Sequence, residues 1–176
     1  MSDLRIIVDH LKLEYSGLMD VREFFKIIGS FCKERDYQKK EDKNHEHNKS
    51  DGKYIEYEIS PWKKVSDYHR YIIKIRLLFQ HLNKVEIVKD KKKVQIDKGK
   101  VIIYLDGYME NDYLNRWDDR PFLLFIRTIY DKFIYKLYTE RFEQILAHEV
   151  QDLYTEIEKF LNMSGSYKVI SKTPRY

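Results

Sequence analysis

The first group of side chains that could bind a metal is the His-Glu-His segment 45–47. Alternate residues of a strand point to the same face, so both imidazoles would lie on one side. A zinc site normally takes three or four ligands, and the spacing identifies no third one. His148 and Glu149 could begin a metalloprotease helix, but Asp152 stands where the second histidine would be. The sequence therefore predicts no metal site and no cofactor.

Catalytic signatures are missing from the rest of the sequence. It contains no Gly-rich phosphate loop, nucleophile elbow or paired-carboxylate motif. Cys32 is the only cysteine, and it falls in an apolar series with helical spacing, which predicts a buried thiol and not a nucleophile. The polar run 117–121 is explained by the capping of a helix that begins near Pro121. These observations favour a binding protein over an enzyme.

One strand could line a ligand cavity. Residues 68–82 alternate between apolar and charged side chains, and the inward side carries a histidine near each end. Such polar groups can orient a ligand at the mouth of an apolar cavity, whereas histidines at strand ends can also simply bind water. The cavity-lining candidates are His69, Tyr71, Ile73, Ile75, Phe79 and His81, together with Phe133 and Leu137 of the C-terminal helix.

The net charge of +4 is concentrated in two places. Residues 89–100 hold six lysines against two aspartates, and the segment after Met163 is also basic. Such clusters can bind RNA, a ribosome or an acidic protein by long-range attraction. They can equally be solvated hairpin edges, where lysines discourage aggregation. The basic-surface candidates are Lys91, Lys92, Lys93, Lys98, Lys100, Lys168, Lys172 and Arg175.

Length and composition set the broad class. The 176 residues, with 43% hydrophobic and 35% charged side chains, can bury a sizeable core. No stretch approaches the roughly eighteen uncharged apolar residues of a membrane span, and residues 1–14 are too charged for a signal peptide. We expect a soluble, cytoplasmic protein without a membrane span.

Hydrophobic periodicity predicts the order of the elements. A strand at 4–15 precedes a helix with a capping box at Asp20 and Glu23, and a long helix runs from Pro121 to Asn162. Between the helices the period is two, and turn signals, including Asp-Lys-Gly at 97–99, divide the chain into strands. The six strands expected there are 37–47, 54–62, 68–82, 85–88, 94–96 and 101–108.

The last helix carries two apolar stripes that are out of phase. The second stripe has the spacing of a heptad seam, four, three, four and three, which is typical of a helix that meets another helix. We therefore expect residues 140–161 either to pack on the short helix of the same chain or to form a homodimer through the same segment of a second copy. This seam consists of Leu146, Val150, Leu153, Ile157 and Phe160.

In the order and length of its elements, the chain resembles the START-like, helix-grip (SRPBCC-type) superfamily over residues 4–161. The resemblance implies an α+β fold in which a seven-stranded curved antiparallel sheet (β-α-β6-α) wraps around a long C-terminal helix. It implies one domain at 1–163, followed by a basic tail at 164–176. Members of this superfamily often hold an apolar small molecule between sheet and helix. We therefore expect a non-catalytic module for an apolar ligand; the alternatives are a factor that binds RNA, a ribosome or an acidic protein, and an enzyme acting on a cavity-bound substrate.

Overall fold

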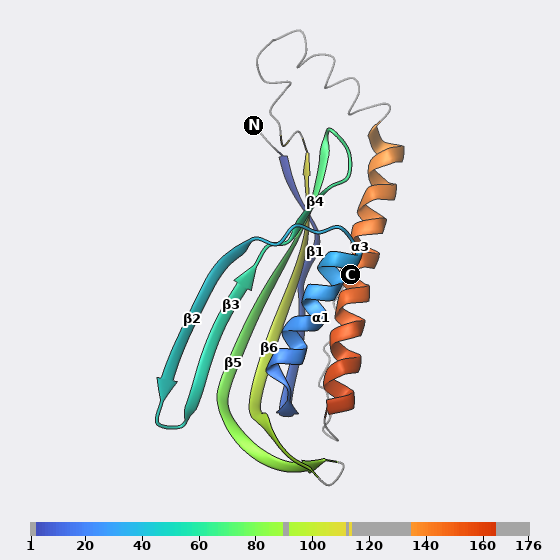
Figure 1. Cartoon of the computed structure of the whole chain (residues 1–176). Coiled ribbons are helices and arrows are strands. Elements are labelled where there is room, and N and C mark those ends of the chain that lie inside the picture. Colours follow the sequence, from blue (N-terminus) through green and yellow to red (C-terminus); the bar gives the residue numbers. More distant parts are fainter. Residues whose placement is uncertain (1–2, 90–91, 112, 114–134, 165–176) are drawn as a thin grey trace.

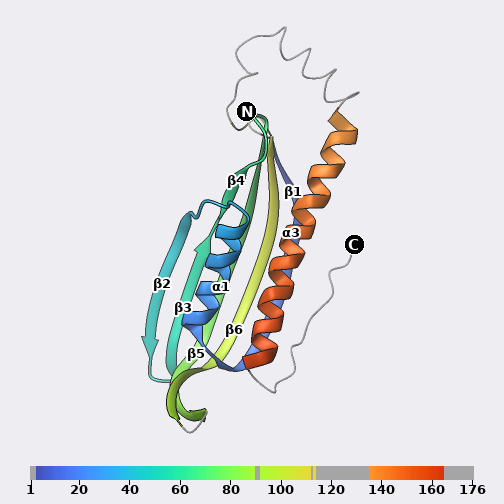
Figure 2. The same cartoon turned by 45° about the vertical axis from the view of Figure 1, so that its right-hand side comes forward.

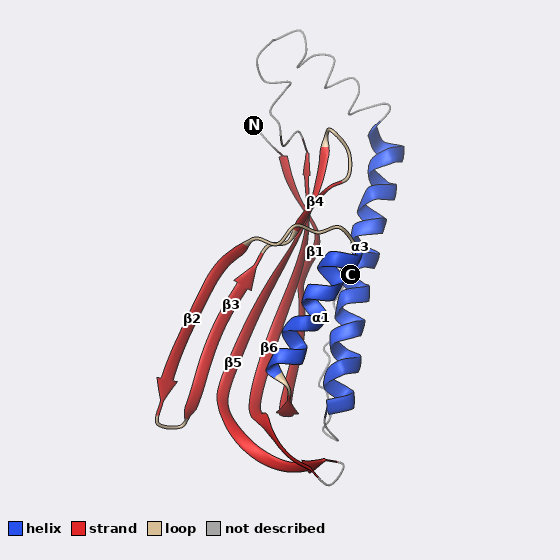
Figure 3. Ribbon diagram, in the orientation of Figure 1, coloured by secondary structure: helices blue, strands red, loops and turns tan. Residues whose placement is uncertain are grey.

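The described residues form an antiparallel sheet of six strands with two helices on one of its faces (Figures 1 and 3). The computed structural model describes residues 3–89, 92–111, 113 and 135–164. The fold is therefore α+β, as the sequence predicted, with one helix near the C-terminus. The elements in chain order are β1 (Asp3–Met19), α1 (Val21–Glu34), β2 (Glu41–Lys49), β3 (Gly52–Ile59), β4 (Trp62–Lys64), β5 (His69–Lys89), β6 (Lys92–Asn111) and α3 (Tyr135–Ser164).

The strands follow the order β1-β6-β5-β3-β2, and β4 pairs with β5 beside this path. Every pair is antiparallel, and the first strand pairs with the last one along most of its length. The prediction of an antiparallel sheet is thus confirmed.

The structure has two long strands, β5 and β6, where the sequence predicted four shorter ones. The Asp-Lys-Gly segment 97–99 is not a turn, because it lies inside β6 and pairs with residues 17–19 of β1. Gly99 serves a close approach: a Cβ atom there would lie 2.8 Å from the carbonyl oxygen of Gln80. A glycine that makes room for a neighbouring strand looks the same in the sequence as a glycine that makes a turn.

Helix α1 begins where the capping box placed it. The Asp20 carboxylate accepts hydrogen bonds from the backbone N–H groups of Arg22 at 3.0 Å and Glu23 at 3.1 Å. The helix continues through Gly29 without a break. Its inward stripe is fully buried and consists of Phe24, Ile28, Phe31 and Cys32.

Helix α3 lies along β1 and β6 and also touches α1 (Figure 2). Leu146, Val150, Leu153 and Ile157 of the heptad seam are at most 1% exposed. The Phe160 and Phe24 rings lie 6.1 Å apart, so the expectation that this segment packs on the short helix of its own chain is confirmed.

The seam also packs on the sheet, which its heptad spacing did not predict. Gly107 of β6 makes this approach close, because a Cβ atom there would lie 3.1 Å from a Val150 methyl group. Part of the predicted helix, from Pro121 to residue 134, lies outside the described residues. Neither described helix is long and apolar enough to cross a lipid bilayer.

Candidate functional site

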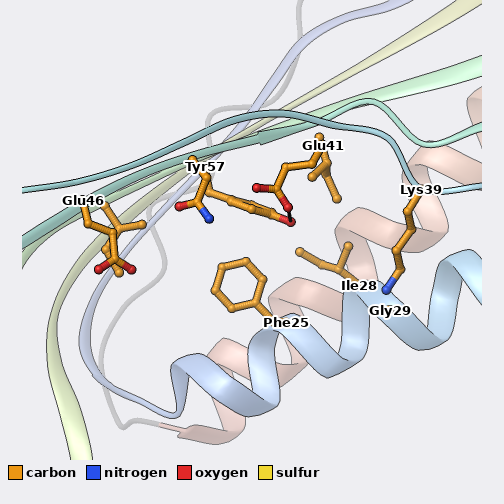
Figure 4. A pocket seen from close by; sticks show the side chains of 10 residues that line it. Phe25, Ile28, Gly29, Lys39, Glu41, Glu46 and Tyr57 are labelled. Carbon is orange, nitrogen blue, oxygen red and sulfur yellow. Dashed lines mark hydrogen bonds between the residues drawn. The ribbon is translucent and has the colours of Figure 1, made fainter.

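A groove of about 370 Å³ lies between α1 and the β2–β3 hairpin (Figure 4). It forms because α3 covers the β1 and β6 side of the sheet, while β2 and β3 reach out beyond both helices (Figure 1). Nearly all side chains of β2 are exposed, so none of the described elements fills the space under this strand. The groove is lined by Phe25, Ile28, Gly29, Lys39, Glu41, Asn44, Glu46, Ile55, Tyr57 and Ile59.

The floor of the groove is apolar and packs against the core. Ile28 and Ile59 are buried in the core, and Ile55 and Tyr57 pack against it. The Phe25 ring meets the Tyr57 ring edge to face at 5.0 Å and also lies 6.1 Å from the Phe79 ring. Aromatic pairs of this kind hold their rings in fixed orientations, so the floor offers a preformed apolar surface.

The rim of the groove is polar. The Tyr57 hydroxyl donates a hydrogen bond to Glu41 at 3.2 Å, and burial, reinforced by this carboxylate, raises the pKa of Tyr57. Glu46 forms an ion pair with Lys53 at 2.6 Å. The Lys39 ammonium lies over Gly29, 3.0 Å from where a Cβ atom would stand, and forms no ion pair with any described residue. The groove thus offers hydrogen-bonding groups at its edge and apolar groups at its floor.

Cys32 is buried on α1, as predicted. Burial raises the pKa of its thiol, an effect that the nearby Lys39 ammonium only reduces. The thiol therefore stays protonated near neutral pH and has little nucleophilic character.

Most of the predicted cavity-lining residues lie together but do not line this groove. His69, Tyr71, Ile73, Ile75 and Phe79 share the inward face of β5, and each is at most 5% exposed. They belong to the packed core under α1 and α3. Phe133 lies outside the described residues, and Leu137 belongs to α3 with a side chain outside the described part.

Hydrogen bonds complete this core at its two polar members. The Tyr71 hydroxyl donates to the carbonyl oxygen of Phe142 at 2.6 Å, and the His69 Nδ1 atom lies 2.9 Å from the Asn111 Oδ1 atom. Both contacts hold β5 to its neighbours. They account for the two polar side chains in the core without a ligand.

His81 does not share that inward face, which corrects its predicted orientation. A register shift between Gln80 and Asn83 changes the phase of β5, and His81 adopts a positive φ of 53° there. Leu82 is buried in its place, while the His81 side chain is 54% exposed. Alternation alone could not reveal the bulge, because an extra residue moves every later side chain to the other face.

A buried polar cluster joins α3 to the sheet, and no sequence pattern pointed to it. Glu149 accepts a hydrogen bond from the Tyr37 hydroxyl at 2.6 Å and forms an ion pair with Lys63 at 2.5 Å. The Lys63 ammonium also lies 4.7 Å from the centre of the Tyr37 ring. Burial and the Glu149 charge raise the pKa values of Tyr37 and Tyr71 well above their usual range. We call Glu149, Tyr37 and Lys63 the Glu149 cluster.

The structure describes only some of the basic-surface candidates. Lys98 is exposed on β6, and Lys100 is half-buried with its ammonium 3.4 Å from Glu14. The backbones of Lys92 and Lys93 lie in β6, but their side chains are outside the described part. Lys91, Lys168, Lys172 and Arg175 lie outside the described residues altogether.

The β5–β6 hairpin extends past its neighbours. Pairing with β1 ends at Asp97 and pairing with β3 ends at Leu82, yet β5 and β6 stay paired as far as Lys89 and Lys92. The end of the hairpin is therefore a two-stranded ribbon, which curls away from the sheet (Figure 1).

No protein-family model, curated protein or solved structure matches this chain.

Proposed function

We propose that this chain is a non-catalytic binding module of the START-like, helix-grip type that holds an apolar small molecule. The groove between α1 and the β2–β3 hairpin is the observation that supports this proposal. Its volume of about 370 Å³ falls in the range of small-molecule sites, and its apolar floor and polar edge are the usual composition of such sites. The strand order, with β1 beside the last strand and α3 along the sheet, is compatible with a helix-grip fold.

The ligand would lie in a different place from the one that the superfamily suggests. The side of the sheet under α3 is filled by residues that are almost fully buried. We therefore place the ligand under β2 and beside α1, with its apolar part against the Phe25 and Tyr57 rings. Its polar end would face Glu41 and Lys39 at the rim.

Filling the groove tests this placement. Asn44 lines the groove from β2 and stands opposite Tyr57 in the sheet register. In an Asn44→Trp variant the indole would occupy the space of the ligand. We expect the parent protein to bind a flat apolar probe such as 1-aminoanthracene, measured by fluorescence titration. The variant should bind it at least about tenfold more weakly, a loss of about 1.4 kcal/mol.

The matched control is His45→Trp. This neighbouring residue of β2 does not line the groove, so the same indole should leave probe binding unchanged. Equal affinity of the Asn44→Trp variant and the parent protein would refute the placement. A parent protein that binds no apolar probe would count against the ligand-binding function itself.

The basic ribbon supports a second candidate function, binding to RNA, a ribosome or an acidic protein. Residues 84–100, which include the projecting ribbon and the adjoining part of β6 that pairs with β1, carry seven lysines against three acids. A projecting two-stranded ribbon can reach into a partner. If the partner is RNA, each neutralised phosphate releases counterions. Three such contacts to a single strand should weaken binding about 20-fold between about 50 and 200 mM salt.

Charge reversal distinguishes RNA binding by the ribbon from a general attraction between RNA and a positively charged protein. We expect a Lys92→Glu, Lys93→Glu, Lys98→Glu variant to lose binding to a single-stranded RNA in a filter or anisotropy assay. A variant with three reversals elsewhere, Lys26→Glu, Lys33→Glu and Lys40→Glu, has the same net charge and should keep most of its affinity. RNA affinity that responds to neither salt nor the ribbon variant would exclude this function.

A further inference from the structure

Strand β1 contains an irregular stretch that brings three potential metal ligands together. Its pairing with β6 shifts register between Ile6 and Val8 and again between Val8 and Leu11. Asp9 and His10 therefore both stand where one residue would face Asp106 of β6. His10 has a positive φ of 49°, a conformation that few residues other than glycine adopt. The bulge folds both side chains toward Asp106.

Asp106 is almost fully buried although it lies on the outer face of the sheet. Its side chain is 5% exposed, and its Oδ1 atom accepts a hydrogen bond from the His10 backbone N–H at 2.7 Å. A carboxylate removed from water needs a compensating positive charge or several hydrogen bonds. Because Asp106 is buried, we expect a cation beside its carboxylate.

The nearest protein cations on β5 bind elsewhere. Lys74 stands opposite Asp106 in the sheet register, but its ammonium lies 2.7 Å from Glu58. Arg76, two pairs further along, also reaches Glu58, at 3.2 Å. Within the described part of the chain, Asp106 forms an ion pair with His10 alone, whose Nδ1 atom lies 3.3 Å from its Oδ1 atom.

Asp9 adds a second carboxylate to this pair. Its Oδ1 atom lies 2.7 Å from His10 Nδ1, and its side chain is exposed. Ligand atoms of Asp9, His10 and Asp106 all lie within 4.8 Å of one another. A zinc ion bound at about 2.1 Å by each ligand in tetrahedral geometry would need ligand atoms about 3.4 Å apart. The observed spacing needs only small side-chain movements to meet this requirement.

We propose that Asp9, His10 and Asp106 bind a divalent transition-metal ion of the zinc class. One imidazole nitrogen and two carboxylate oxygens suit zinc or cobalt better than magnesium, which prefers oxygen ligands alone. Asp106 would supply the buried, pre-oriented ligand, while the exposed Asp9 and His10 let the ion enter from solvent. The site lies on the outer face of the sheet, opposite the helices, and is therefore independent of the groove.

Isothermal titration with Zn²⁺ tests the proposal on metal-free protein. We expect one ion per chain with micromolar affinity, little response to Mg²⁺ and a higher melting temperature with zinc, because the ion binds the folded state. His10→Asn and Asp106→Asn should each weaken zinc binding at least tenfold. Asparagine tolerates the positive φ at position 10, and at position 106 it keeps an acceptor for the His10 N–H group. Circular dichroism should confirm that both variants fold.

The control is a His45→Asn, His47→Asn variant, which removes two exposed imidazoles of β2 that could also attract zinc. It should bind zinc as the parent protein does. Three results would overturn the proposal: no saturable zinc binding, unchanged binding in folded His10→Asn protein, or loss of binding in the His45→Asn, His47→Asn variant. If the Asp106→Asn variant fails to fold, Asp9→Asn, a substitution on the surface, replaces it in the test. It should also weaken zinc binding, and unchanged binding would overturn the proposal.

Discussion

Replacing Glu149 with alanine should lower the free energy of unfolding by about 3–5 kcal/mol. The substitution leaves the Lys63 ammonium, whose side chain is 17% exposed, without the carboxylate that lies 2.5 Å away. It also leaves the buried Tyr37 hydroxyl without its acceptor at 2.6 Å. An unpaired charge and an unpaired hydroxyl in the core both destabilise the folded state, because they have lost their hydrogen bonds to water and gain none in the protein. Equilibrium denaturation in urea measures the difference.

Two further variants show whether the burial of the Glu149 cluster is responsible. Glu143 lies on the same helix and pairs with Arg5 at 2.7 Å, but this ion pair is exposed to solvent. Glu143→Ala should therefore cost less than about 1 kcal/mol. Glu149→Gln keeps an oxygen for Tyr37 and removes only the charge, so its effect should fall between the two. Equal costs at positions 143 and 149 would contradict the buried role of Glu149.

The sequence predicted those parts of the fold that depend on local patterns. The capping box at Asp20 placed the start of α1, because a side chain and the backbone three residues later form one local unit. The alternation in residues 69–79 placed the core face of β5 correctly. The alternation failed at His81, because the register shift between Gln80 and Asn83 changes the phase of β5 there.

The two candidate sites could not be predicted from the sequence, for a different reason. Strand β2 reads Glu-Asp-Lys-Asn-His-Glu-His-Asn-Lys and has no apolar face, so nothing local shows that it forms one wall of a groove. The proposed metal ligands His10 and Asp106 are 96 residues apart in the chain, and only the pairing of β1 with β6 brings them together. Sites built from distant segments follow from topology and register, which composition and spacing do not encode.

Introducing two charges into the seam of α3 should prevent folding. Val150 and Ile157 are at most 1% exposed in the hydrophobic core, so glutamate at both positions would bury two carboxylates among apolar side chains. The cost of one unpaired buried charge already approaches the total stability of a typical domain, about 5–15 kcal/mol. We expect a Val150→Glu, Ile157→Glu variant to lose its cooperative thermal transition in circular dichroism.

A double variant on the outer side of the same helix separates burial from charge. Gln151 and Asn162 are exposed, so Gln151→Glu, Asn162→Glu should melt close to the parent protein. Sedimentation of the parent protein shows whether it forms the homodimer that the heptad spacing also allowed. Because the seam is already filled by α1, β1 and β6 of the same chain, the parent protein should not need a second copy to bury it. A parent dimer that the seam variant converts into a folded monomer would show that the seam serves a partner and not the core.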